Sequence, residues 1–183
     1  MDVVIVYESM FGNTHAVADA VATGIFDTDP AAHVTVLPVG EATADDVAGA
    51  GLIIVGGPTH MRGMTSGLSR RKGLEAQEQA ASSKGATFRH EPAAQGPGIR
   101  DWLGALPPVS PGQLAAAFDT RVRSAFAGGA AKRIARRLRR HGYRLARPPE
   151  GFIVTGTEGP LGEGELARAR EWGAALVRHP AHA

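Results

Sequence analysis

The sequence contains no cysteine, and this absence excludes several kinds of site. Without thiols the chain cannot form disulfides, thiolate-bound metal centres or iron–sulfur clusters, and it has no cysteine nucleophile. Any redox chemistry must therefore come from an organic cofactor that the protein binds.

Signals for membranes and export are also missing. No apolar run approaches the roughly 20 residues that a membrane-spanning helix needs. An apolar run begins at residue 3, which leaves no room for a signal peptide before it, so we expect a cytoplasmic protein without membrane partners. The length of 183 residues and the 43% of hydrophobic residues predict a single domain over residues 1–183.

Acidic residues are absent from the whole segment 121–147, which is rich in arginine. Its basic residues are Arg121, Arg123, Lys132, Arg133, Arg136, Arg137, Arg139, Arg140, Arg144 and Arg147. Apolar residues at helical spacing within it (Ala131, Ile134, Ala135, Leu138) predict a helix with one buried stripe and a basic outer face. That face is either a solvated surface or a docking surface for an acidic partner. Nucleic-acid binding is not favoured, because no aromatic platform or zinc-finger spacing accompanies the charge.

The rest of the chain alternates between strand and helix patterns, which favours a parallel sheet with helices on both faces. Strands are predicted over Asp2–Tyr7, His33–Pro38, Gly51–Gly56, about Gln113–Phe118 and about Gly151–Thr155. Helices are predicted over Asn13–Ile25, after the capping segment Thr43–Asp46, over Gly98–Leu106, in the basic segment and over Glu163–Val177. Residues 66–97 are predicted to form an inserted helix and loop at the rim of a ligand pocket.

A short polar segment follows the first strand and leads directly into a helix. Ser9, Asn13 and Thr14 offer side-chain donors there, and Gly12 lets the backbone approach a ligand closely. Free N–H groups at the helix start would add the positive end of the helix dipole. The pattern predicts a phosphate site that needs no Lys or Arg, although a capped helix after a strand is also common in α/β proteins. The motifs Gly-x4-Gly-Lys-Ser/Thr and Gly-x-Gly-x-x-Gly are absent.

Two motifs resemble those of the flavodoxin family. Tyr7, Ser9, Gly12 and Thr14 are similar to the loop that holds the FMN phosphate, and Gly56-Gly57-Pro58-Thr59 is similar to the loop that lies against the isoalloxazine ring. The resemblance implies a flavodoxin-like α/β fold, a doubly wound five-stranded parallel sheet of order 2-1-3-4-5 in a three-layer α/β/α arrangement. It also implies FMN as cofactor, bound outside the carboxyl ends of strands one and three.

The resemblance implies cofactor contacts from three segments. These are Ser9, Met10, Phe11, Gly12, Asn13 and Thr14; Pro58, Thr59, His60, Met61, Arg62 and Gly63; and Asp119, Thr120 and Arg121. In the second segment, His60 or Met61 would cover the ring face, and Arg62 would meet charge on the reduced ring. In the third, Asp119 and Thr120 would contact the pyrimidine edge. The family often places Tyr or Trp near this third segment, whereas this chain does not.

The resemblance implies an FMN-binding protein that transfers electrons to a redox partner protein. The basic charge of segment 121–147 indicates that this partner would be acidic and would dock there. One alternative is an NAD(P)H-dependent FMN oxidoreductase that reduces quinones or small molecules, with residues 66–97 as part of a substrate lid. Another is a non-redox module that binds partners through its basic face. A receiver domain, which shares this sheet order, is excluded because Gly56-Gly57 and Thr155-Gly156 stand where it needs Asp and Lys.

Overall fold

The computed structural model describes residues 1–59, 97–109, 112–123, 129–156 and 158–178. His60, Met61, Arg62 and Gly63 lie outside these ranges, as does nearly all of the predicted insert over 66–97. None of the helices in the described ranges is both long and apolar enough to cross a membrane.

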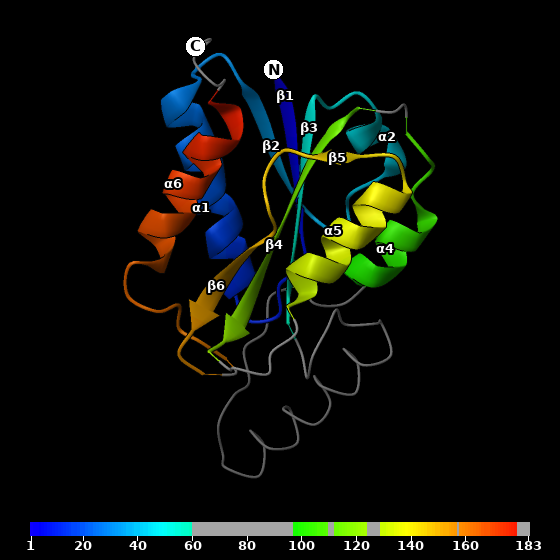
Figure 1. Cartoon of the computed structure of the whole chain (residues 1–183). Coiled ribbons are helices and arrows are strands. Elements are labelled where there is room, and N and C mark those ends of the chain that lie inside the picture. Colours follow the sequence, from blue (N-terminus) through cyan, green and yellow to red (C-terminus); the bar gives the residue numbers. More distant parts are fainter. Residues whose placement is uncertain (60–96, 110–111, 124–128, 157, 179–183) are drawn as a thin grey trace.

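A parallel sheet forms the centre of the molecule (Figure 1). Its strands are β1 (Asp2–Tyr7), β2 (His33–Pro38), β3 (Leu52–Pro58), β4 (Leu114–Val122), β5 (Arg144–Leu145) and β6 (Glu150–Val154). The strand order is β2-β1-β3-β4-β5, which confirms the predicted order. The β-branched run of β1 lies between two strands and is buried on both faces, as such runs are in parallel sheets.

The fifth strand position is shared by two segments. β5 pairs with the start of β4, at Leu114 and Ala115, whereas β6 pairs with its later part, from Phe118 to Val122. Pro148 and Pro149 lie between the two segments, and proline has no N–H to donate to a strand ladder. The predicted strand over Gly151–Thr155 corresponds to β6.

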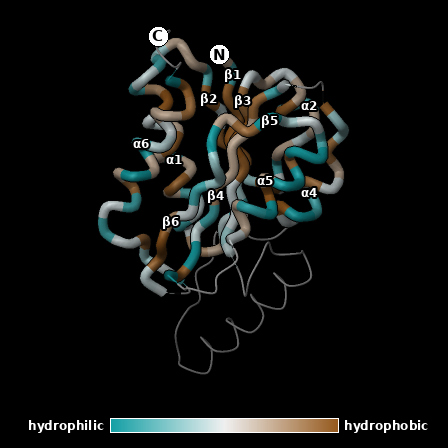
Figure 2. Tube along the Cα trace, in the orientation of Figure 1, coloured by the Kyte–Doolittle hydropathy of each residue, from teal (hydrophilic) through white to brown (hydrophobic). Residues whose placement is uncertain are grey.

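Helices cover both faces of the sheet, as the three-layer arrangement requires (Figure 1). α1 (Asn13–Thr28) and α6 (Glu165–Val177) pack on one face, around Phe118, Phe152 and Trp172. α2 (Ala44–Ala48), α4 (Ile99–Ala105) and α5 (Ala130–Arg140) pack on the other. Figure 2 shows the apolar residues concentrated in the central strands and on the helix sides that face them.

Candidate functional site at the carboxyl ends of β1, β3 and β4

The predicted site lies where three neighbouring parallel strands end. Tyr7 of β1 is paired with Gly56 of β3, and Pro58 of β3 is paired with Thr120 of β4. The segments that follow β1 and β3 therefore lie beside the end of β4. This edge also receives the start of α1, as expected for a ligand site in a doubly wound sheet.

The start of α1 has the geometry of an anion site. Gly12 precedes the first helical residue with φ of +83°, a left-handed conformation that favours glycine. Its N–H donates to Oγ of Ser9 at 3.1 Å, and this hydrogen bond links the two ends of the segment 9–12. Gly12 has no side chain with which to cap this helix, and no acidic residue stands in its first turn. The N–H groups of Asn13 and Thr14 have no carbonyl available within the helix and no acceptor elsewhere among the described residues, so they can bind an anion.

Two polar residues at the start of α1 connect this helix to distant parts of the chain. The hydroxyls of Thr14 and Thr120 are 2.8 Å apart and buried, and either can be the donor. The side-chain amide of Asn13 donates to the carbonyl of Glu158 at 2.9 Å, in the segment after β6. The helix start is thus held by β4 and by the segment that follows β6.

One cavity of about 230 Å³ joins residues from all three predicted segments. It is lined by Ser9, Met10, Phe11, Asn13, Thr14, Pro58, Thr59, Thr120, Arg121, Val122 and Val154. Val122 and Val154 were missed, because the predicted fourth strand ended at Phe118 and strand pairing cannot be read from periodicity. A larger groove of about 630 Å³ runs along α1 and α6, but it shares no lining residue with this cavity.

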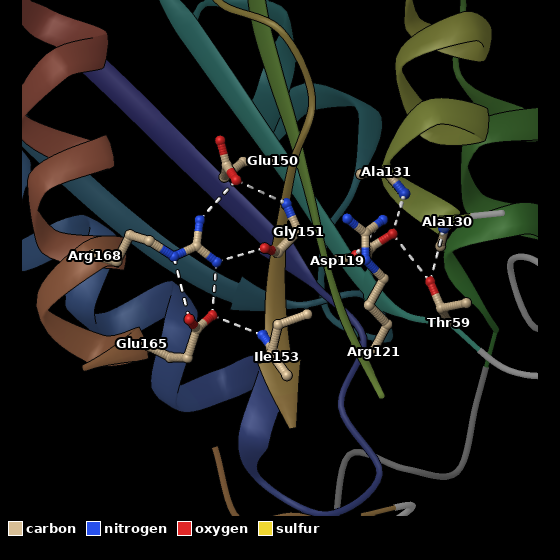
Figure 3. A network of polar contacts seen from close by, with 10 residues as sticks. All are labelled: Thr59, Asp119, Arg121, Ala130, Ala131, Glu150, Gly151, Ile153, Glu165 and Arg168. Carbon is tan, nitrogen blue, oxygen red and sulfur yellow. Dashed lines mark hydrogen bonds and ion pairs between the residues drawn. The ribbon is translucent and has the colours of Figure 1, made fainter. Parts of the chain in front are cut away.

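Asp119 and Thr120 point to opposite faces of the sheet. The fourth strand was predicted to end at about Phe118, but β4 continues to Val122, so successive side chains of this segment point to opposite faces of the sheet. Thr120 points toward α1, whereas the buried carboxylate of Asp119 accepts hydrogen bonds from the N–H of Ala131 (2.9 Å) and the hydroxyl of Thr59 (3.0 Å) (Figure 3). Asp119 is not among the residues that line the cavity.

Asp119 therefore caps the start of α5 and also secures the end of β3. The hydroxyl of Thr59 accepts from the N–H of Ala130 at 2.8 Å. The N–H groups of Ala130 and Ala131, the first two residues of α5, therefore both have side-chain partners. Loss of hydration on burial raises the pKa of Asp119, and the hydrogen bond from Ala131 and the charge of Arg121 oppose that rise.

Arg121 lines the cavity, but its guanidinium lies beside Asp119 and packs against the backbone of Gly129 and Gly151. Nη1 lies 3.6 Å from Oδ1 of Asp119. A Cβ added at Gly129 or at Gly151 would overlap the guanidinium, so the backbone packs directly against it on both sides. The charge of Arg121 is partly offset by Asp119, and this residue is not a free cation above the cavity.

A second polar network supports β6, which carries the cavity residue Val154. Arg168 of α6 forms ion pairs with Glu150 (2.7 Å) and Glu165 (2.6 Å), and Glu165 also accepts from the N–H of Ile153 at 2.7 Å (Figure 3). This network was not predicted from the sequence. The i, i+3 spacing of Glu165 and Arg168 on a predicted helix is the signal that could have revealed it.

Comparisons with known proteins identify the fold. No family model matches the chain, and no curated protein sequence matches it. Among solved structures, a flavodoxin of Streptococcus pneumoniae superposes with a TM-score of 0.63 at 18% identity, over 96% of this chain and 97% of that one. Flavodoxin 2 of Bacillus cereus gives 0.63 at 17% identity, with the same coverage. This chain has the flavodoxin fold.

A flavodoxin, WrbA-like protein of Agrobacterium tumefaciens also superposes, with a TM-score of 0.52 at 20% identity over 96% of this chain and 94% of that one. Each of these three structures is thus matched across nearly the whole chain. At these identities the likeness shows the fold alone.

Proposed function

We propose that this protein binds FMN at the carboxyl ends of β1, β3 and β4 and carries electrons to or from a redox partner protein. The uncapped start of α1, preceded by Gly12 in the left-handed conformation and opening onto the cavity, is the observation that carries this proposal. FMN, when bound, would supply the electron-transfer chemistry that the side chains lack.

The donors at this site suit a phosphate group. A phosphate dianion only accepts hydrogen bonds, and the described residues that line the cavity include no carboxylate. Ser9 accepts from the N–H of Gly12 and therefore keeps its own hydroxyl hydrogen for a ligand. Asn13 and Thr14 add N–H groups at the positive end of the helix dipole. The FMN phosphate would lie in this cradle, with Pro58 and Thr59 nearer the ring.

The remaining predicted contacts are part of the same proposal. His60 or Met61 would cover the ring face, Arg62 would lie near the reduced ring, and Gly63 would complete that loop. Arg121 would contribute only a part of its charge, because Asp119 lies 3.6 Å from its guanidinium.

Titration of the apoprotein with FMN and with riboflavin tests the phosphate cradle. Each hydrogen bond to a charged group contributes about 1.5–3 kcal/mol, so one such bond already gives FMN an advantage of about tenfold or more. We expect FMN to bind at least tenfold more tightly than riboflavin. Equal affinities for the two flavins would contradict the proposal.

We propose a carrier rather than a reductase because the structures of Streptococcus pneumoniae and Bacillus cereus that superpose with a TM-score of 0.63 are named flavodoxins. The alternative, an NAD(P)H-dependent reductase, is tested by mixing the FMN-loaded protein with NADH or NADPH and benzoquinone. A carrier should oxidise neither nucleotide faster than the same concentration of free FMN does. Turnover well above that level would establish the reductase.

The redox partner that we propose has an acidic surface and docks near the basic segment 121–147. On α5, Lys132, Arg133, Arg136, Arg139 and Arg140 are exposed, and none of them forms an ion pair with another described residue. The same helix begins at Ala130 and Ala131, which bond Thr59 and Asp119 at the edge of the site. A partner on this face would therefore lie beside the flavin site.

A further inference from the structure

Thr14 and Thr120 form a buried pair of hydroxyls at the base of the cradle. Their oxygens are 2.8 Å apart, and the residues are 2% and 5% exposed. Both line the cavity, and neither hydroxyl has another hydrogen-bond partner among the described residues. The pair joins the first turn of α1 to the end of β4, two elements far apart in the sequence.

The number of hydrogens limits what this pair can do. Each hydroxyl has one hydrogen to donate and two lone pairs that can accept. If Thr14 donates to Thr120, the hydrogen of Thr14 is used and the anion loses a donor. If Thr120 donates to Thr14, the hydrogen of Thr14 is free to point at an anion in the cradle. A chain of donors that ends on a charged acceptor is also strengthened by mutual polarisation.

We propose that Thr120 is a positioning residue for the phosphate: its hydroxyl donates to Oγ1 of Thr14 and thereby directs the hydrogen of Thr14 into the cradle. This inference rests on the proposed binding of FMN. It gives Thr120 a different role from the ring-edge contact that the family resemblance implies, because the residue acts at the phosphate end and through another side chain.

The backbone of β4 holds Thr120 firmly enough for this role. Thr120 is paired with Pro58 of β3 on one side and with Phe152 of β6 on the other. Its carbonyl accepts from the N–H of Thr59 at 2.8 Å. The preceding residue, Asp119, is fixed on the opposite face by the start of α5. The hydroxyl of Thr120 is therefore presented to Thr14 from a rigid strand.

The test compares Thr120→Val, which removes the hydroxyl at nearly constant volume, with Thr120→Ser, which keeps it. Loss of one ordinary hydrogen bond costs about 1 kcal/mol, which corresponds to about fivefold. We expect Thr120→Val to weaken FMN about fivefold while riboflavin affinity stays unchanged, and Thr120→Ser to retain the wild-type ratio of the two affinities. Thr28→Val is the matched control, because the Thr28 hydroxyl bonds Gly24 at the other end of α1.

A double-mutant cycle with Thr14→Val shows whether Thr120 acts through Thr14. We expect Thr14→Val to cost FMN about tenfold or more, and Thr120→Val to have no further effect on the FMN-to-riboflavin ratio in that background. An unchanged ratio in Thr120→Val, or an equal loss for both flavins, would overturn the positioning role. If the wild-type protein itself does not prefer FMN, the proposed function fails instead, and the two failures are distinguishable.

Discussion

At the scale of single residues, Asp119 is where burial and charge conflict most directly. Its side chain is fully buried, and Oδ1 has no hydrogen-bond partner among the described residues, although Arg121 lies 3.6 Å away. Oδ2 accepts from the N–H of Ala131 and from the hydroxyl of Thr59. The carboxylate therefore anchors α5 and the end of β3, and loss of hydration makes its charged form costly.

We expect stability to depend on the protonation of Asp119. Burial raises its pKa in the folded protein above the unfolded value near 3.8, so the folded state binds this proton more tightly. The stabilisation from protonation is full below the unfolded pKa and is lost as pH rises through the folded pKa. Asp119→Asn removes this dependence while its amide oxygen can still accept from Ala131.

Urea unfolding of the wild type and of Asp119→Asn, at neutral pH and near pH 4, measures the effect. The free energy of unfolding of the wild type, relative to that of the variant, should increase as pH falls. A difference that stays constant with pH, or that decreases toward acid, would mean that the folded state does not raise this pKa.

At the scale of elements, α1 and α6 pack with their backbones in contact. A Cβ added at Gly24 would overlap the carbonyl oxygen of Arg170, and a Cβ added at Gly173 would overlap that of Val21. The two glycines thus permit a closer approach than any other residue would. The ion pair of Asp27 with Arg170, at 2.6 Å, lies on the exposed side of the same contact.

We expect Gly173→Ala to destabilise the protein although alanine favours helix. Alanine gains up to about 1 kcal/mol of helix propensity over glycine, whereas forcing extra volume into a packed contact costs about 1–3 kcal/mol. Gly104→Ala in α4 is the control, because the nearest atom to its Cβ would be Nη1 of Arg137 at 3.9 Å. That control should be neutral or slightly stabilising in thermal unfolding. If Gly173→Ala were as stable as Gly104→Ala, the backbone contact between α1 and α6 would be refuted.

At the scale of the whole molecule, the sequence was most informative where local pattern alone decides the structure. The bounds of β1 and β2 and the buried stripe of α5 agree with the prediction. The sheet order agrees too, but it came from the family resemblance, because periodicity does not show which strands are neighbours. The end of β4 was predicted too early, since Asp119, Thr120 and Arg121 have the polarity of a loop while their partners lie on other elements.

Contacts between distant segments could not be predicted from the sequence. The pairing of Thr14 with Thr120, and the capping of α5 by Asp119, depend on how three strands and two helices meet. The interruption of the sheet edge between β5 and β6 could have been inferred, because Pro148 and Pro149 are visible in the sequence. The local sequence pattern and the family resemblance predicted the segment of the cradle, but the role of each residue depends on its neighbours in space.

Charge is also unevenly distributed over the molecule. The net charge is only +2, yet the outer face of α5 brings like charges together at helical spacing. Arg136 stands four residues from both Lys132 and Arg140, and like-charge pairs at this spacing each destabilise a helix by about 0.2–0.5 kcal/mol. These repulsions oppose helix stability, and docking of an acidic partner would explain why the basic face is present.

We expect Arg136→Glu to have opposite effects on stability and on electron transfer. The variant should unfold at a slightly higher urea concentration, because a glutamate four residues before Arg140 forms a favourable pair with it. It should also accept electrons more slowly from a reduced plant-type [2Fe–2S] ferredoxin, an acidic carrier, by about tenfold at low salt, since steering by charge raises association rates about 10- to 1000-fold. The difference should shrink as salt is added.

Arg178→Glu, at the exposed end of α6, is the matched control and should leave the rate unchanged. Equal rates for the two variants in stopped-flow experiments at low salt would show that α5 is not the docking face.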